Sequence, residues 1–268
     1  MVFDAGHFKR LERAGYNRLG ARYRQSAGAR RDLADGLLAA ARLTPGLRLL
    51  DLAAGPGLLA SQARSAVGEA GLTVATDIAE GQLACCPDLP RVAADGEALP
   101  FADAAFDRVL CGLGLMFFPD ADRALAEARR VLRTDGLLAL SVWGEAAEVP
   151  LVECALACLR RMLPPPKAAR PSIFRFGDRA ELERRLARAD FQDIRVEPLK
   201  FSVRFADAGA YWQAFLDLAG GAAESLSRLP AERQAALAGE VATELAPHAV
   251  SAGYRLVSTV LIAVARPI

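Results

Sequence analysis

A glycine-rich turn carries the clearest chemistry in this sequence. Residues 47–65 read LRLLDLAAGPGLLASQARS, which is a short apolar run, a Gly-Pro-Gly turn and the start of a helix. Turns of this kind place backbone N–H groups against an anion or a nucleotide. Gly55, Gly57 and Ala60 satisfy G-x-G-x-x-G/A, and Asp77 follows about twenty residues later, so the spacing admits a dinucleotide such as NAD.

Two features of the sequence count against a dinucleotide. The first apolar run begins only near residue 47, behind an entire segment of helical character. Asp51 also lies inside the turn sequence, four positions before Gly55. A carboxylate there would repel a pyrophosphate, whereas a ligand with a positive charge would gain from it. The residues therefore favour a cationic nucleotide ligand over NAD.

The elements around the turn alternate between strands and helices. Helical spacing precedes the turn, and DADRALAEARRVL at 120–132 is clearly amphipathic. Short apolar runs separated by helices predict βαβ units and a parallel sheet that is buried on both faces. The predicted strands up to this point lie at 47–52, 71–77, 91–95, 104–114 and 135–143.

The alternation ends after residue 143. Residues 148–176 read as an amphipathic helix and a Pro-rich connection, which we interpret as an insertion above the sheet. A helix capped by Asp178 and a strand at 192–205 follow. Residues 207–250 are again helical, and 254–267 is expected to enter the sheet as its last strand.

Four motifs, in order, resemble those of class I S-adenosylmethionine (SAM)-dependent methyltransferases. DLAAGPG is similar to the family's glycine-rich motif, with Ala53 where glycine is commoner. VATDIAEGQL resembles the second-strand motif, and AADGEALPFADAAFDRVLCGLGLMFF the third and fourth. EARRVLRTDGLLALSVW resembles the helix-turn-strand that usually contains RPGG. The resemblance covers residues 45–143 continuously and 171–205 more weakly, and it is nearest to the ubiquinone/menaquinone C-methyltransferase branch (methyltransferase domain type 11).

The resemblance implies an α/β fold with a Rossmann-like seven-stranded sheet, mostly parallel with an antiparallel last strand, and a helical cap. It also divides the chain into six expected segments. These are a helical segment covering the cofactor site (1–46), the SAM-binding core (47–144), a helical insertion (145–175), a core helix and strand (176–205), a helical cap (206–250) and the last core strand (251–268).

The cofactor implied by the resemblance is SAM, with S-adenosylhomocysteine as product and no metal. Asp77 is expected to bind both ribose hydroxyls, and Asp95 and Gly96 to lie beside the adenine. Asp51 is expected to act near the ammonium group. The purely structural alternatives are that Asp77 is a turn residue, that Asp95 caps a helix and that Cys111 packs in the core. The cofactor-binding residues expected in full are Asp51, Ala53, Gly55, Gly57, Asp77, Ile78, Gln82, Asp95, Gly96, Cys111 and Tyr16.

No convincing general base emerges from the sequence. The catalytic candidates are His7, Tyr16 and Glu145. The alternatives are that His7 is a solvated helix residue, that Tyr16 is an aromatic residue packed on the sheet and that Glu145 is a solvated acid in a loop. Tyr16 and Tyr23 lie seven residues apart on one helical face, and either could contact a sulfonium. His248 is expected to be a surface or turn residue. Apolar clusters at 116–118, 172–176 and 211–215 could line a substrate pocket, with core packing as the default.

Composition limits the classes of partner. The chain has 268 residues, a net charge of +1 and no basic stripe, which argues against nucleic acid. Five cysteines without a CxxC pair argue against a disulfide framework and a zinc site, and Cys154 and Cys158 are expected in a core. With no apolar run near 18 residues, we expect no integral membrane segment and a cytoplasmic protein. A homodimer is one assembly that it could form.

The sequence therefore predicts a SAM-dependent methyltransferase that moves a methyl group to a small, largely apolar metabolite by in-line displacement. Whether the acceptor atom is carbon, oxygen or nitrogen stays open. The alternatives are a SAM-binding protein of the same fold without methyl transfer, working as a cyclase or a regulatory module, and then an NAD-dependent oxidoreductase.

Overall fold

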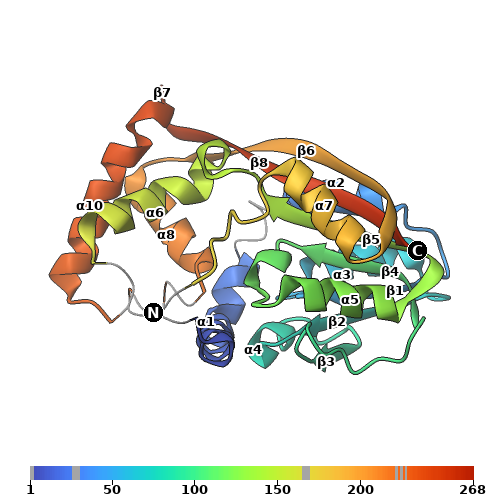
Figure 1. The fold of residues 1–268 in the computed structure, drawn as a ribbon. Coiled ribbons are helices and arrows are strands. Elements are labelled where there is room, and N and C mark those ends of the chain that lie inside the picture. Colours follow the sequence, from blue (N-terminus) through green and yellow to red (C-terminus); the bar gives the residue numbers. More distant parts are fainter. Residues whose placement is uncertain (1–2, 26–30, 165–169, 221–222, 224–225, 227) are drawn as a thin grey trace.

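The computed structural model describes residues 3–25, 31–164, 170–220, 223, 226 and 228–268 (Figure 1). Two helices precede the sheet, α1 (Ala5–Gln25) and α2 (Arg31–Ala41), as the sequence predicted. The predicted Pro-rich connection falls largely on residues 165–169, which lie outside the described residues.

A single sheet forms the centre of the fold, and its strand order is β3-β2-β1-β4-β5-β8-β6. Neighbours among β1 to β5 are parallel, whereas β8 is antiparallel to both β5 and β6. This confirms the expected sheet with its antiparallel last strand. The strands are β1 (Arg48–Leu52), β2 (Leu72–Asp77), β3 (Arg91–Ala93), β4 (Phe106–Gly112), β5 (Leu132–Trp143), β6 (Phe191–Phe205) and β8 (Gly253–Pro267).

One short strand was not expected. Residues 207–250 were predicted to be helical, but β7 (Ala249–Val250) pairs with the start of β8. The helices of this segment are α8 (Ala208–Leu218) and α10 (Ala231–Leu245), followed by the 3₁₀ turn η4 (Ala246–His248). A two-residue strand has no period of its own, so only the pairing with β8 reveals it.

Helices cover both faces of the sheet. Leu49 of β1 packs in a cluster with α2 and α3 (Leu58–Val67), while the adjacent Leu50 faces the cluster of α5 (Ala121–Val131) and α7 (Arg179–Arg188). Such burial on both faces is why the parallel strands read as continuous apolar runs. Asp178 caps α7 as predicted, because its carboxylate accepts the Glu181 backbone N–H at 2.7 Å.

The remaining helices form a separate cap. The helix α6 (Pro150–Met162) packs with α8 and α10 at one end of the molecule, and β6 and β8 extend from the core to reach them (Figure 1). Cys154 and Cys158 are buried in this cap core, as expected. The Tyr211 hydroxyl accepts the Ala155 backbone N–H at 2.9 Å, and burial raises the pKa of this phenol.

Three short helical segments follow the parallel strands. The helix α4 (Glu80–Leu83) follows β2, the 3₁₀ turn η2 (Leu115–Phe117) follows β4, and η3 (Ala146–Glu148) follows β5. All three therefore begin at the carboxyl ends of parallel strands, which is the edge where open α/β sheets bind ligands.

Candidate functional site

A cavity lies at the carboxyl ends of β1, β2 and β4, where α1 covers the sheet. The strand β1 has β2 on one side and β4 on the other, so the strand order reverses there. Ligands of open α/β sheets bind at such reversals. Eight of the eleven residues expected to bind the cofactor line this cavity, namely Tyr16, Ala53, Gly55, Asp77, Ile78, Gln82, Asp95 and Gly96.

The glycine-rich turn forms the floor of the cavity in an unusual backbone conformation. Ala53, Gly55 and Gly57 have φ values of 56°, 56° and 76°. Left-handed backbone favours glycine, so Ala53 is held there at a steric cost. An added Cβ at Gly57 would lie 2.9 Å from Cys86, so a larger residue there would displace Cys86. The turn thus exposes backbone to the cavity while packing tightly behind it.

Asp51 lies beneath the turn and does not line the cavity. Its Oδ2 accepts the Ala60 backbone N–H at 2.9 Å, whereas its Oδ1 is buried without a partner among the described residues. Burial raises the pKa of this carboxyl to about 8. Cys111 is buried near it, and burial raises the pKa of the thiol to about 12, so the cysteine is no nucleophile at neutral pH.

Asp77 joins the end of β2 to the glycine turn. Its Oδ2 accepts the Gly55 backbone N–H at 2.9 Å, and its Oδ1 accepts that of Ala79 at 2.8 Å. Burial raises the pKa of Asp77, although these backbone hydrogen bonds oppose the rise. Each carboxylate oxygen can accept more than one hydrogen bond, so Asp77 can still receive donors from a ligand in the cavity.

Gln82 offers a second acceptor at the same wall. Its amide nitrogen donates to the Tyr16 carbonyl at 2.8 Å, while its Oε1 is buried and has no partner among the described residues. A buried oxygen without a donor is costly unless something supplies one. Since Gln82 lines the cavity, a ligand hydroxyl is chemically suited to that oxygen.

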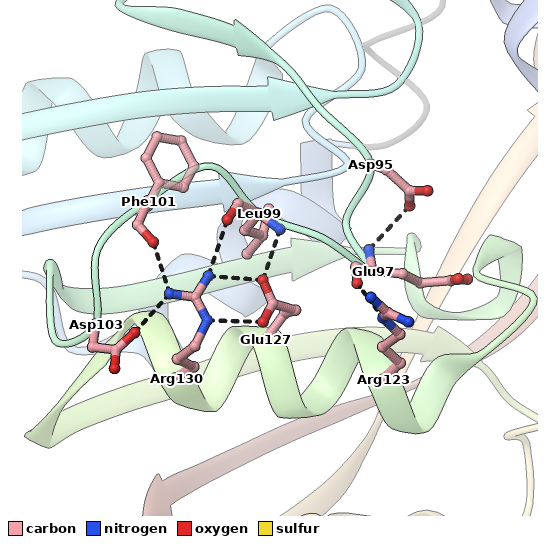
Figure 2. Close-up of polar contacts among 8 residues, drawn as sticks. All are labelled: Asp95, Glu97, Leu99, Phe101, Asp103, Arg123, Glu127 and Arg130. Atoms are coloured by element: carbon pink, nitrogen blue, oxygen red, sulfur yellow. Dashed lines mark hydrogen bonds and ion pairs between the residues drawn. The ribbon is translucent and has the colours of Figure 1, made fainter.

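The loop that carries Asp95 and Gly96 is fixed by α5 (Figure 2). Arg130 donates to the carbonyls of Leu99 and Phe101 at 3.0 and 2.7 Å, and it pairs with Glu127 at 2.8 Å. Glu127 in turn accepts the Leu99 backbone N–H at 2.7 Å, and its hydrogen bonds from Arg130 hold the pKa of the Glu127 carboxyl low. Satisfied polar networks of this kind rigidify a loop.

The other end of the same loop is held at Glu97. Arg123 of α5 donates to the Glu97 carbonyl at 2.7 Å, and the Asp95 carboxylate accepts the Glu97 backbone N–H at 3.0 Å (Figure 2). The Glu97 side chain accepts the Asp120 backbone N–H at 2.9 Å. The position of Asp95 is therefore set before any ligand arrives.

Charged side chains of α1 close the cavity from above. Lys9 lies 2.6 Å from both Asp95 and Glu97. Burial disfavours the charge of Lys9, but its hydrogen bonds to these carboxylates outweigh that effect and raise its pKa. Glu12, which is 7% exposed, pairs with Arg170 at 2.9 Å. The cavity encloses about 100 Å³ with α1 in this position.

Aromatic rings occupy the middle of the cavity. The Tyr16 ring meets the Tyr23 ring and the Phe117 ring edge to face, each with centroids 5.8 Å apart. Phe117 and Phe118 line the cavity, whereas Met116 between β4 and α5 is part of the core. Of the predicted apolar cluster at 116–118, the two phenylalanines are thus the members that face the site.

The other candidate residues lie elsewhere. His7 and Glu145 are exposed and do not line the cavity, and His248 is half-buried in η4. From the clusters at 172–176 and 211–215, Phe176 packs in the main core and Tyr211 in the cap core. Each therefore has the packing or surface position that was the alternative at the sequence level.

Sequence reasoning missed the contributions of Lys9 and Glu12. Both lie on the face of α1 that also carries Tyr16 and Tyr23, at helical spacing. The sequence showed that spacing for Tyr16 and Tyr23. Lys9 and Glu12 extend the same face of the helix toward its N-terminus. The signal that could have found them is a polar pair on the apolar face of a helix that must cover a site.

Comparison with known proteins agrees with this geometry. A family model described as "Methyltransferase domain" matches residues 50–140. Malonyl-[acyl-carrier protein] O-methyltransferase of Geobacter sulfurreducens is 35% identical over 56% of this chain and 57% of its own length. Demethylmenaquinone methyltransferase of Mycolicibacterium vanbaalenii is 32% identical over 58% of this chain and 73% of its own. The chain thus spans little more than half the length of the first of these relatives.

Solved structures share the fold at low sequence identity. Phosphoethanolamine N-methyltransferase 2 of Haemonchus contortus, in complex with phosphomonomethylethanolamine and S-adenosylhomocysteine, has a TM-score of 0.56 at 16% identity. It is matched over 89% of this chain and 53% of its own. The [4+2]-cyclase SpnF has a TM-score of 0.54 at 21% identity, matched over 88% of this chain and 80% of its own.

These likenesses and the fold place the chain in a known class: it belongs to the class I SAM-dependent methyltransferase family, in the branch of the quinone methyltransferases. Within the described residues there is no cluster of three or more His, Cys, Asp or Glu that could hold a metal ion. None of the helices in the described part of the chain is both long and apolar enough to span a membrane.

Proposed function

We propose that this protein transfers a methyl group from SAM to a small, largely apolar metabolite. The observation that carries the proposal is the cavity at the carboxyl ends of β1, β2 and β4, which brings Asp77, Asp95 and the left-handed glycine turn together. These three features lie far apart in sequence, and each has the chemistry that one part of an adenosyl ligand requires.

The residues of the cavity fit such a cofactor. Asp77 and the unpartnered Gln82 oxygen are acceptors for a ribose diol. Gly96 lets the Phe118 ring pack against the backbone, since an added Cβ there would lie 2.5 Å from that ring, and Asp95 beside it can accept from an exocyclic amine. The buried Oδ1 of Asp51 has no partner among the described residues, and this carboxyl beneath the turn can ionise when an ammonium group binds above it.

An apolar hollow continues the cavity beyond the glycine turn. It shares Ala53, Gly55 and Leu113 with the main cavity and adds Leu37 and Ser141. The two spaces together suit an elongated ligand with a polar nucleoside at one end and an aliphatic part at the other. In the proposal, the methionine part of the cofactor occupies this end.

The chemical step asks little of the protein beyond placement. SAM, when bound, supplies an electrophilic methyl group on a sulfonium. Transfer requires an acceptor atom roughly 3 Å from that carbon and in line with the leaving sulfur, so positioning is the main contribution. Tyr16, Tyr23 and Phe117 give the cavity an aromatic lining, and aromatic ring faces suit a cation. His7, Tyr16 and Glu145 stay candidate bases, of which Tyr16 alone lines the cavity.

The proposed acceptor class follows from the relatives and from the charge of the chain. The matched relatives carry names that refer to a demethylmenaquinone and to a malonyl group on a carrier protein. The near-zero net charge gives no field for attracting nucleic acid.

Isothermal titration calorimetry with SAM, S-adenosylhomocysteine and NAD tests the cofactor. We expect both adenosyl compounds to bind and NAD to give no heat. Binding of NAD alone would contradict the proposal. Incubation with methyl-labelled SAM and an extract of the source cells, followed by identification of the labelled product, then identifies the acceptor atom.

A second candidate function is SAM binding without methyl transfer. It is favoured by one finding, the shared fold with the [4+2]-cyclase SpnF. The same labelled incubation separates the two functions, because a cyclase or a regulatory module would bind S-adenosylhomocysteine yet release no labelled product.

A further inference from the structure

Two phenylalanines form one side of the cofactor cavity. Phe117 ends the 3₁₀ turn η2 and Phe118 follows it, and both line the cavity. The Phe118 ring lies against the backbone of Gly96, where an added Cβ would be 2.5 Å from it. This is the side of the cavity that the proposed function assigns to the adenine. We call Phe117 and Phe118 the aromatic wall.

The turn that carries the aromatic wall is short. It has three residues, and its internal hydrogen bonds run from the Phe117 N–H to the Gly114 carbonyl at 2.9 Å and from the Phe118 N–H to the Leu115 carbonyl at 3.3 Å. Short 3₁₀ turns have poorer hydrogen-bond geometry than α-helices. The carbonyl groups at the end of such a turn also need donors from elsewhere. The position of the wall therefore depends on contacts from outside η2.

Arg175 supplies those donors from a distant part of the chain. Its Nη2 donates to the Phe118 carbonyl and, at 3.4 Å, to the Leu115 carbonyl. The guanidinium thus joins the two ends of η2. The backbone behind it is anchored, because the Arg175 N–H donates to the Ser172 carbonyl at 3.2 Å and the next residue, Phe176, is 3% exposed in the main core.

The surroundings of Arg175 offer its charge little other compensation. None of the ion pairs among the described residues includes Arg175, and its Nε is buried without a partner in that part of the chain. Burial lowers the pKa of this guanidinium, and the nearby Arg185 lowers it further. A half-buried charge without a counter-ion is costly. The hydrogen bonds to η2 are the contacts that offset this cost.

Arg185 shares the packing of Arg175 but not its contact with η2. The guanidinium carbons of Arg175 and Arg185 lie 4.7 and 5.3 Å from the centroid of the same Phe176 ring. Arg185 pairs instead with Asp122 on α5, and its side chain is 24% exposed. The two arginines therefore separate the contribution of packing on Phe176 from that of the bonds to η2.

We propose that Arg175 is a positioning residue for the cofactor, because it holds the end of η2 so that Phe118 stays against Gly96. Without the guanidinium, the Phe118 carbonyl loses its donor and turns toward water, which moves the aromatic wall. The cavity then binds the adenosyl group less tightly. This inference rests on the proposed function, since it names a determinant of that same site.

Calorimetry with S-adenosylhomocysteine tests the role of Arg175. We expect Arg175→Met to weaken binding by about tenfold, the loss that follows removal of a charge-assisted hydrogen bond. Arg175→Lys keeps the charge but not the planar fork, so it should recover part of the affinity and bind about threefold more weakly than wild type. Arg185→Met is the matched control and should stay within about twofold of wild type.

Two results of this titration would overturn the role. One is equal affinity in wild type and Arg175→Met. The other is an equal loss in Arg175→Met and Arg185→Met, which would assign the effect to packing on Phe176. Urea unfolding shows whether each variant is folded. If Arg175→Met does not fold, Arg175→Lys carries the test, and wild-type affinity in that variant would contradict the inference.

Kinetics distinguish positioning from a loss of folded protein. In the incubation with methyl-labelled SAM and a fixed amount of cell extract, Arg175→Met should raise the apparent KM for SAM about tenfold and leave kcat within about twofold. A fall in kcat at unchanged KM would show that Arg175 only maintains the fold, and would overturn its role.

The wild-type titration separates this inference from the proposed function. If wild type binds S-adenosylhomocysteine and Arg175→Met binds it equally well, the role of Arg175 fails alone. If wild type does not bind it, the proposed function fails, and the role of Arg175 fails with it.

Discussion

Asp51→Asn tests the electrostatics of the site most directly. Asp51 is fully buried, and burial raises its pKa from 3.8 to about 8. Below pH 8 the folded protein therefore keeps this carboxyl protonated, whereas the unfolded chain ionises it above about pH 4. The folded state binds more protons across that window, so the Asp51 contribution to stability falls as pH rises.

The size of this effect follows from linkage. One proton bound only by the folded state costs about 1.36 kcal/mol per pH unit, so wild type should lose about 2.6 kcal/mol at this position between pH 5 and pH 7. The carboxamide introduced by Asp51→Asn does not titrate, while its oxygen can still accept the Ala60 N–H. Groups that do not interact with Asp51 titrate alike in both proteins and cancel in the difference.

Urea unfolding at pH 5, 6 and 7 measures the difference. We expect the stability of Asp51→Asn relative to wild type to rise by about 2.6 kcal/mol between pH 5 and pH 7. Asp135→Asn, at a side chain that is 78% exposed, is the matched control and should show no such trend. A constant Asp51→Asn difference from pH 5 to pH 7 would refute the buried protonated carboxyl.

The same variant should lose affinity for the cofactor. If the ammonium of SAM ionises Asp51, binding at pH 7 releases close to one proton in wild type and none in Asp51→Asn. Calorimetry in two buffers of different ionisation enthalpy counts that proton. Equal proton release in the two proteins would show that Asp51 does not ionise when the positively charged ligand binds.

Other substitutions probe the walls of the cavity. Asp77→Ala should weaken S-adenosylhomocysteine binding by at least ~1 kcal/mol in calorimetry, the net value of a charge-assisted hydrogen bond; unchanged affinity in the folded variant would contradict the ribose role. Lys9→Met removes both ion pairs that hold α1 at Asp95 and Glu97, so stopped-flow should show faster cofactor association, with the gain shrinking in ~1 M salt. Ala53→Gly relieves a left-handed alanine and should stabilise the fold by about 1 kcal/mol in urea unfolding.

Much of the sheet could be predicted from the sequence because its signals are local. A parallel strand buried on both faces is a short apolar run, and β1, β2, β4 and β5 all read that way. Asp77 and Asp95 could be placed because each follows such a run, and parallel strands bring their carboxyl ends to one edge. In these cases chain order alone determines spatial order.

Features that depend on packing between distant segments could not be predicted in the same way. The face of α1 that covers the cavity depends on the ion pairs of Lys9 with Asp95 and Glu97, which lie 86 and 88 residues further along the chain. The support of the Asp95 loop by Arg130 likewise depends on the docking of α5. Nor did the sequence indicate that Asp51 would belong to β1 and lie beneath the turn with a raised pKa.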